Sequence, residues 1–216
     1  MRKISACILF VSLCLLAGTA LAGSAETKLY KDYFFGQQRA EIQQIPGMRQ
    51  CDQTGDLCLP GQPFAGYSWV QRFAFFDGQL VQVTLVGKLD QGRYYKAFGA
   101  ILNNGYLPVI LQSGDHTFDF LAVAHASGKD AAVHGLNDFE QKALRAGHVL
   151  YTLIPNDAIP LAKEDDSFSS FLLHCPPDMR TVEVEVRDAW MAVRFFVAQK
   201  ARKVMSSDMM QSKDSF

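Results

Sequence analysis

Hydrophobic and polar side chains alternate clearly between residues 64 and 87. Trp69 and Phe73 share one face of an aromatic run, and Val83 and Leu85 share one face of the next run. Asp77-Gly78 separates the two runs, and this dipeptide favours a two-residue turn. The pattern therefore predicts a β-hairpin.

A period of three to four residues indicates helices elsewhere. In residues 92–106, Tyr94, Phe98 and Ile101 form one apolar stripe that ends before Asn104-Gly105, a fitting helix stop. The same reasoning predicts two further helices, at residues 36–45 and 135–147.

Six other runs have the composition of strands. They are residues 107–112, 116–126, 148–155, 168–175, 180–188 and 190–200. The last run also fits a C-terminal helix, because Ala, Met and Arg are common helix formers. Residues 156–167 are polar and predict a loop.

The order of these elements predicts an α+β fold. Hairpins dominate, so we expect a mainly antiparallel sheet with about three short helices packed on it. A unit of one helix followed by a hairpin recurs, which suggests internal duplication with sub-units at residues 30–90 and 91–205.

The first residues resemble an export signal. Arg2 and Lys3 precede an apolar run, and small residues end in Ala20-Leu21-Ala22. The run is shorter than the roughly 20 residues that a membrane-spanning helix needs. We therefore predict a cleaved signal peptide at residues 1–22 and a periplasmic or secreted protein.

The remaining chain is interpreted as one domain at residues 23–205. The polar residues 23–30 and the tail at 206–216 are expected to be disordered. No second apolar stretch is long enough to span a membrane, so we expect no transmembrane segment in the mature chain.

The cysteines support export. Cys51 and Cys58 flank a turn-rich loop, and an oxidising compartment would join them in a disulfide. A zinc site is the weaker alternative, because zinc ligands prefer closer spacing. Cys175 ends an apolar run and is interpreted as a buried free thiol.

Charge and motifs exclude several functions. The formal net charge is −1, so nothing indicates nucleic-acid binding. No nucleophile, phosphate-loop or metalloprotease motif is present, which favours a non-catalytic protein without a cofactor. A hydrolase with dispersed catalytic residues remains an alternative.

Two groups of residues are candidate sites. Phe64, Tyr67 and Trp69 lie beside the cysteine loop and could anchor a protein partner. A second group could bind a metal or small ligand, although exposed loop positions are the favoured interpretation. That group comprises His116, Asp119, His125 and His134.

Residues 34–86 resemble part of the SmpA/OmlA family of small bacterial envelope proteins. The resemblance lies in "FFGQQRAEIQQIPGM", "YSWVQRFAFFDGQL" and "LVQV", a glycine-led helix followed by a hairpin. It implies a non-catalytic protein that binds an unknown envelope protein, and this is our first functional hypothesis. A periplasmic small-ligand or metal-binding protein is the alternative.

Overall fold

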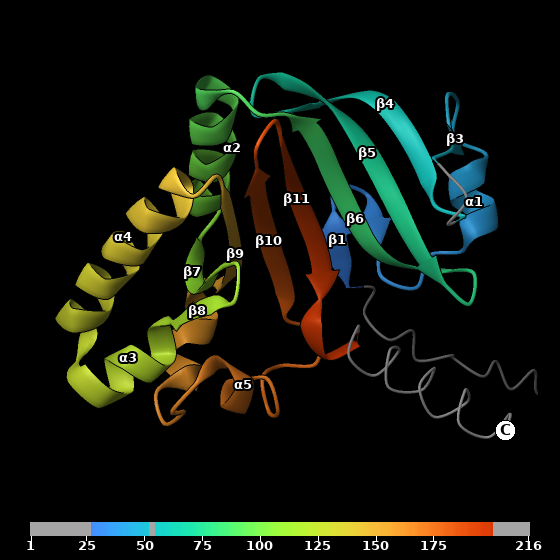
Figure 1. Ribbon diagram of the computed structural model, residues 1–216. Coiled ribbons are helices and arrows are strands. Elements are labelled where there is room, and N and C mark those ends of the chain that lie inside the picture. Colours follow the sequence, from blue (N-terminus) through green and yellow to red (C-terminus); the bar gives the residue numbers. More distant parts are fainter. Residues whose placement is uncertain (1–26, 52–54, 201–216) are drawn as a thin grey trace, which may run out of the picture.

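The computed structural model describes residues 27–51 and 55–200 (Figure 1). The strands are β1 (Lys28–Tyr30), β2 (Tyr33–Phe34), β3 (Arg49–Gln50), β4 (Leu57–Phe64), β5 (Tyr67–Phe76), β6 (Gln79–Lys88), β7 (Tyr106–Ser113), β8 (His116–Asp119), β9 (His148–Pro155), β10 (Arg180–Arg187) and β11 (Trp190–Val197). The helices are α1 (Arg39–Gln43), α2 (Gln91–Asn103), α3 (Phe120–Ser127), α4 (Lys129–Arg145), the 3-10 helix η1 (Asn156–Ala162) and α5 (Phe168–Phe171). None of these helices is both long and apolar enough to cross a membrane.

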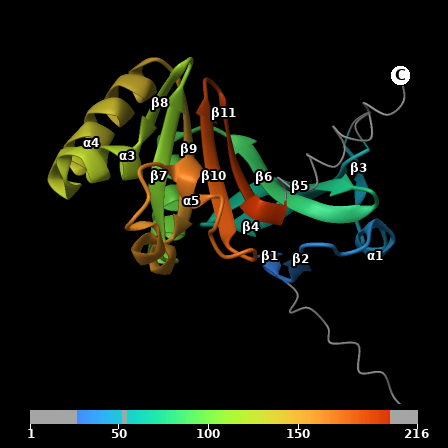
Figure 2. The same ribbon diagram turned by 90° about the horizontal axis from the view of Figure 1, so that it is seen from below.

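Nine strands form one antiparallel sheet in the order β3-β4-β5-β6-β11-β10-β9-β7-β8. The expected α+β fold with a mainly antiparallel sheet is confirmed. β6 belongs to the predicted sub-unit at residues 30–90 and β11 to the one at 91–205, and the two strands pair within this one sheet. β1 and β2 form a separate small sheet, and β1 packs on β6 and β11 (Figure 2).

Two tight turns set the register of the first half. Asp77 and Gly78 both have positive φ, at 48° and 72°, as a type I′ turn requires. The predicted β5–β6 hairpin is therefore confirmed. Ala65 and Gly66 repeat this geometry, with φ of 50° and 79°, and join β5 to β4, a strand that the pattern did not predict.

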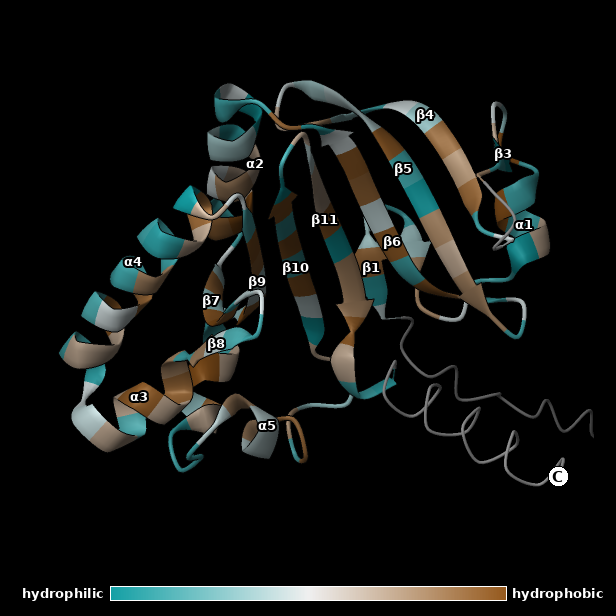
Figure 3. Cartoon of the chain, in the orientation of Figure 1, coloured by the Kyte–Doolittle hydropathy of each residue, from teal (hydrophilic) through white to brown (hydrophobic). Residues whose placement is uncertain are grey.

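Alternation along the strands separates two faces of the sheet, as the hydropathy colours along β10 illustrate (Figure 3). Val182, Val184 and Val186 project into the main core, where α2 contributes Ala97 and Ile101. A second core lies at the opposite face of the β7–β9 end. It includes Val109, Ile154, Leu121, Ala158 and Phe171, so η1, α3 and α5 cover that face.

The predicted strand at residues 116–126 is wrong beyond its first four residues. β8 ends at Asp119, whose carboxylate then accepts hydrogen bonds from the backbone N–H groups of Leu121 (2.9 Å) and Ala122 (3.1 Å). This capping interaction starts α3 in a segment whose apolar composition suits either structure.

The predicted strand at residues 168–175 is also wrong. The Ser167 hydroxyl accepts a hydrogen bond from the Ser170 backbone N–H (3.2 Å) and caps α5, a single helical turn. The expected loop at residues 156–167 contains η1. The structure consequently has more helices than the three that we expected.

Other boundaries are closer to expectation. The run at residues 190–200 forms the strand β11, and the helix expected at 92–106 is α2. α4 begins at Lys129, earlier than expected. Leu29, expected to be disordered, is buried in β1. The predicted segments 1–22 and 206–216 lie outside the described residues.

Gly87 provides a test of the packing between β6 and α2. A Cβ there would clash with Arg93 Nη1 and approach Trp69 Cε3 to 3.0 Å. We expect Gly87→Ala to lower the free energy of unfolding by about 1–3 kcal/mol in urea denaturation. Gly99→Ala is the matched control, because its Cβ meets open space. Alanine favours helix over glycine, so this substitution should raise the free energy of unfolding by about 0.5–1 kcal/mol. Equal effects of the two substitutions would contradict this account.

Candidate functional site

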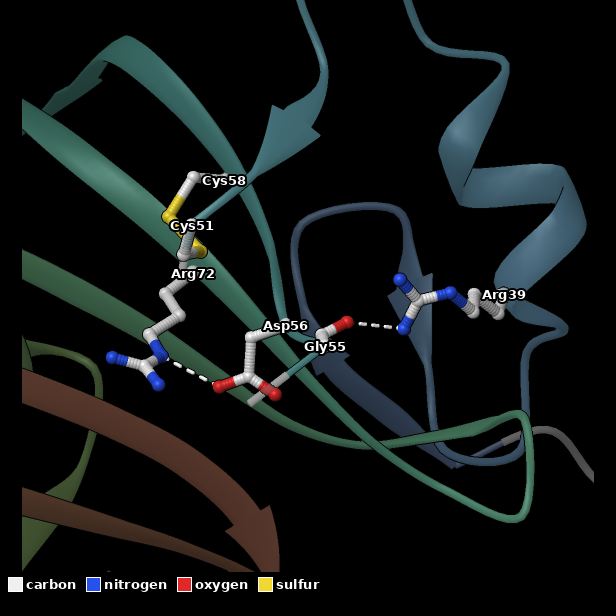
Figure 4. The surroundings of a disulfide bond; sticks show 6 residues. All are labelled: Arg39, Cys51, Gly55, Asp56, Cys58 and Arg72. Atoms are coloured by element: carbon white, nitrogen blue, oxygen red, sulfur yellow. Dashed lines mark hydrogen bonds and ion pairs between the residues drawn. A yellow bond between two sulfur atoms is a disulfide. The ribbon is translucent and has the colours of Figure 1, made fainter. Parts of the chain in front are cut away.

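The predicted disulfide between Cys51 and Cys58 is present (Figure 4). It links the residue after β3 to β4, and Cys58 pairs with Arg49 in the sheet. The backbone N–H of Cys51 also donates to the Asp56 carbonyl at 2.9 Å. The disulfide therefore closes a short loop at the end of the sheet.

Two arginines hold the disulfide loop from opposite sides (Figure 4). Arg39 of α1 donates to the Gly55 carbonyl, and its guanidinium lies 5.1 Å from the centroid of the Phe75 ring. Arg72 of β5 forms an ion pair with Asp56, with 2.6 Å between Nε and Oδ2. These contacts attach Gly55 and Asp56 to α1 and β5.

The predicted aromatic interaction face needs a correction. Trp69 is only 1% exposed, and its Nε1–H donates to the Phe64 carbonyl at 2.9 Å. Arg93 further covers the indole, with 5.0 Å between the guanidinium carbon and the ring centroid. Phe64 and Tyr67 are half-buried. Because Trp69 is part of the core, it is not available to a partner.

The four residues proposed as metal ligands serve other purposes or lie apart. Asp119 caps α3 and also accepts from the Phe168 backbone N–H at 2.8 Å. His116, His125 and His134 come from β8, α3 and α4. Within residues 27–51 and 55–200, no three His, Cys, Asp or Glu side chains cluster closely enough to hold a metal ion.

A serine, an aspartate and a histidine do meet beside α5, but not as a catalytic triad. The Ser170 hydroxyl donates to Asp165 at 2.9 Å, and His174 Nε2 lies 3.1 Å from the other carboxylate oxygen. A triad needs the serine bonded to the imidazole instead. Nearby Cys175 is a buried free thiol, as expected, and burial raises its pKa.

A buried polar network connects α2, α4 and β9. The Tyr151 hydroxyl donates to Glu140 at 2.7 Å and lies 2.9 Å from the Tyr94 hydroxyl. Burial raises the pKa of Tyr94 to about 12 and also raises the pKa of Tyr151. The raised pKa values reflect the cost of ionising a phenol inside this network, which suits a structural role.

Charged side chains on the sheet face opposite the main core are paired with each other. Arg194 contacts Glu183 and Glu185, and Glu185 also pairs with Arg187 at 3.1 Å and with His148 at 3.6 Å. Burial raises the pKa of Glu183 although Arg194 opposes the shift. These charges largely satisfy one another.

Two adjoining cavities lie where α2 ends and β1 crosses the sheet. The inner cavity has a volume of about 140 Å³ and the outer one about 670 Å³. Asn104, Tyr106 and Arg180 line both, so these three residues form their shared rim. The remaining inner wall consists of Tyr30, Lys31, Phe64, Ala100, Ile101, Val182 and Phe195.

Arg180 is the charged residue of the shared rim. It starts β10, and the alternation of that strand puts its side chain on the same face as the buried Val182. Its Nε donates to the Tyr106 hydroxyl, and Nη1 donates to the Leu29 carbonyl at 3.4 Å. Among the described residues, no carboxylate forms an ion pair with Arg180, although Asp157 and Asp178 line the outer cavity.

Sequence patterns did not indicate this site. Its residues come from β1, β4, α2, β7, β10 and β11, and the contact between Arg180 and Leu29 joins positions 151 residues apart. Arg180 resembles an ordinary polar residue at a strand start, and Tyr30 lies in a segment expected to be disordered. Only the tertiary fold brings them together.

Comparisons with protein-family models, curated proteins and solved structures gave no significant match to this chain. The resemblance of residues 34–86 to the SmpA/OmlA segment stays a prediction.

Removal of the disulfide should destabilise the protein measurably. We expect Cys51→Ala/Cys58→Ala to lower the free energy of unfolding by about 2.5 kcal/mol, because the open loop gains entropy in the unfolded chain. Reductant should lower the stability of the unmodified protein to the same level and leave the double variant unchanged. If reductant also destabilised the double variant, the loss of stability would not come from the Cys51–Cys58 disulfide alone.

The Tyr94–Tyr151 network should make stability fall in alkali. Unfolded tyrosines ionise near pH 10, whereas Tyr94 ionises near pH 12 in the fold. The contribution is complete below pH 10 and is lost as the pH rises towards 12. Urea midpoints measured between pH 8 and 11.5 should fall less for Tyr151→Phe than for Tyr95→Phe, whose phenol is exposed. If the urea midpoints of the two variants depend on pH in the same way, the Tyr94–Tyr151 network does not cause the loss of stability in alkali.

Proposed function

We propose that this chain is an exported, non-catalytic protein that binds a small ligand in the paired cavities around Arg180. The observation that carries the proposal is a rim with an arginine that has no carboxylate partner in the described chain, beside a pocket walled by aromatic side chains. Ligand sites generally combine apolar walls with a few convergent polar groups. The disulfide is compatible with export.

Ligand binding is favoured over the first hypothesis of protein–protein contact. That hypothesis placed the contact on the disulfide loop and its aromatic flank of Phe64, Tyr67 and Trp69, and Trp69 is buried. Phe64 instead contributes to the inner cavity. The hydrolase alternative gains no support here, because the Ser170 hydroxyl bonds to Asp165 and not to the His174 imidazole, as a triad would require.

Ala100 offers a direct test of the cavity. It lies on α2 in the inner wall, and Ala100→Leu would fill the space with apolar atoms without weakening the helix. Ala126→Leu is the matched control, since Ala126 is an exposed residue of α3. Circular dichroism should first establish that both variants are folded.

Ligand-detected NMR with a library of neutral, anionic and cationic fragments should then reveal binders. We expect a group of fragments to bind the unmodified protein and Ala126→Leu but to lose binding, by at least about tenfold, to Ala100→Leu. If no fragment binds, or if Ala100→Leu binds as well as the control, the proposed function is wrong.

A further inference from the structure

The inner cavity has the size of one aromatic ring. Its volume of about 140 Å³ is close to the roughly 150 Å³ of an engineered apolar protein cavity that binds benzene. Phe64, Tyr30 and Phe195 line it, and Tyr30 stacks on Phe195 with 4.7 Å between ring centroids. Such walls favour a flat apolar group over a flexible polar chain.

The charges around the inner cavity have one sign. Lys31 and Arg180 line it, and no carboxylate from the described ranges does. The Lys31 ammonium donates to the Pro63 carbonyl at 3.2 Å, so part of its hydrogen-bonding capacity is used. Nη2 of Arg180 has no hydrogen-bond partner within the described ranges, and a planar guanidinium is well suited to bind a carboxylate.

A second polar group beside the inner cavity lacks a partner. Tyr30 is only 8% exposed, and its hydroxyl has no hydrogen bond within the described part of the chain. This oxygen is fully buried, so Tyr30 contributes its ring and not its hydroxyl to the cavity wall. Burial raises the pKa of Tyr30 to about 12.

The outer cavity limits where a negative charge can lie. Away from the rim it is lined by Asp157, Asp178 and Lys28, and the Lys28 ammonium lies 3.9 Å from the Asp32 carboxylate. The two aspartates therefore disfavour an anion placed far from the rim. The shared rim at Asn104, Tyr106 and Arg180 is therefore the favoured position for the charged group. This arrangement leaves the outer cavity for solvent or for a neutral, polar extension of the ligand.

We propose that the ligand is an aromatic carboxylate, with its ring in the inner cavity and its carboxylate on Arg180. This inference rests on the proposed function, because it assigns a chemical class to the same site. No covalent step is involved, and the specificity comes from ring size together with one charge-assisted contact.

Three probes separate the contributions of ring and charge. Phenylacetate carries both, 2-phenylethanol replaces the carboxylate by a neutral hydroxymethyl group, and acetate lacks the ring. Binding can be followed by Trp69 fluorescence in Trp190→Phe, because the Phe64 ring is 5.9 Å from the Trp69 ring and the chain has 2 tryptophans. Calorimetry on the unmodified protein provides an independent measurement.

We expect phenylacetate to bind the unmodified protein at least about tenfold more tightly than 2-phenylethanol, and acetate to bind more weakly than either. Arg180→Gln should abolish the preference for phenylacetate over 2-phenylethanol. Arg187→Gln should keep it, since Arg187 pairs with Glu185 on the other face of the sheet. If Arg180→Gln does not fold, the affinities of phenylacetate and 2-phenylethanol for the unmodified protein still test whether the site prefers a carboxylate.

The outcomes distinguish this inference from the proposed function. Equal affinities for phenylacetate and 2-phenylethanol, both lost in Ala100→Leu, would overturn the anionic class and leave the ligand site intact. Tighter binding of acetate than of 2-phenylethanol would overturn the assignment of the ring to the inner cavity. Failure of all three probes and of every library fragment to bind would overturn both proposals.

Discussion

The pairing of β11 with β6 is the interaction on which the rest of the structure depends. Seven residue pairs, from Gln82–Phe196 to Lys88–Trp190, join the last described strand to the first half of the chain. β11 also pairs with β10, so it completes a continuous sheet between segments far apart in sequence. The buried Val83, Leu85 and Val193 add apolar contacts beneath these hydrogen bonds.

The cavities follow from this pairing. β11 places Phe195 under Tyr30, and the adjacent β10 brings Arg180 to Tyr106 and to the backbone of Leu29. Without β11 in the sheet, β1 would lose one of the strands on which it packs. The fold and the candidate site are therefore consequences of the same long-range contact.

The balance of charges also distinguishes this site from the rest of the surface. Arg72 pairs with Asp56, and Arg194 is shared by two glutamates. Arg180 instead contacts a phenol and a carbonyl, neither of which neutralises it. A partly buried cation without a counter-ion costs free energy, and a ligand carboxylate would lower that cost.

Sequence patterns predicted those helices, strands and turns that neighbouring residues determine. Asp77-Gly78 marked a hairpin because both residues accept positive φ, and the stripe of Tyr94, Phe98 and Ile101 marked α2. The disulfide followed from cysteine spacing and compartment. In contrast, α3 depends on the Asp119 cap in a sequence that also suits a strand.

The candidate site could not be predicted in this way. Tyr30 is buried only because β1 packs across β6 and β11, and a polar N-terminal segment gives no sign of that contact. Trp69 is the converse case, since its place beside a loop made it a candidate contact residue and the structure buries it in the core. Burial in both cases is decided by residues distant in the chain.

The central claim is that Arg180 binds the carboxylate of a ligand whose ring fills the adjacent cavity. The most direct test is a titration with phenylacetate followed by ¹H–¹⁵N NMR of both backbone amides and arginine side chains. The account predicts that the Arg180 Nε–H signal and the amides of Ile101 and Val182 shift together and saturate at one ligand per chain. Unchanged signals at these positions, with shifts elsewhere or none, would contradict it.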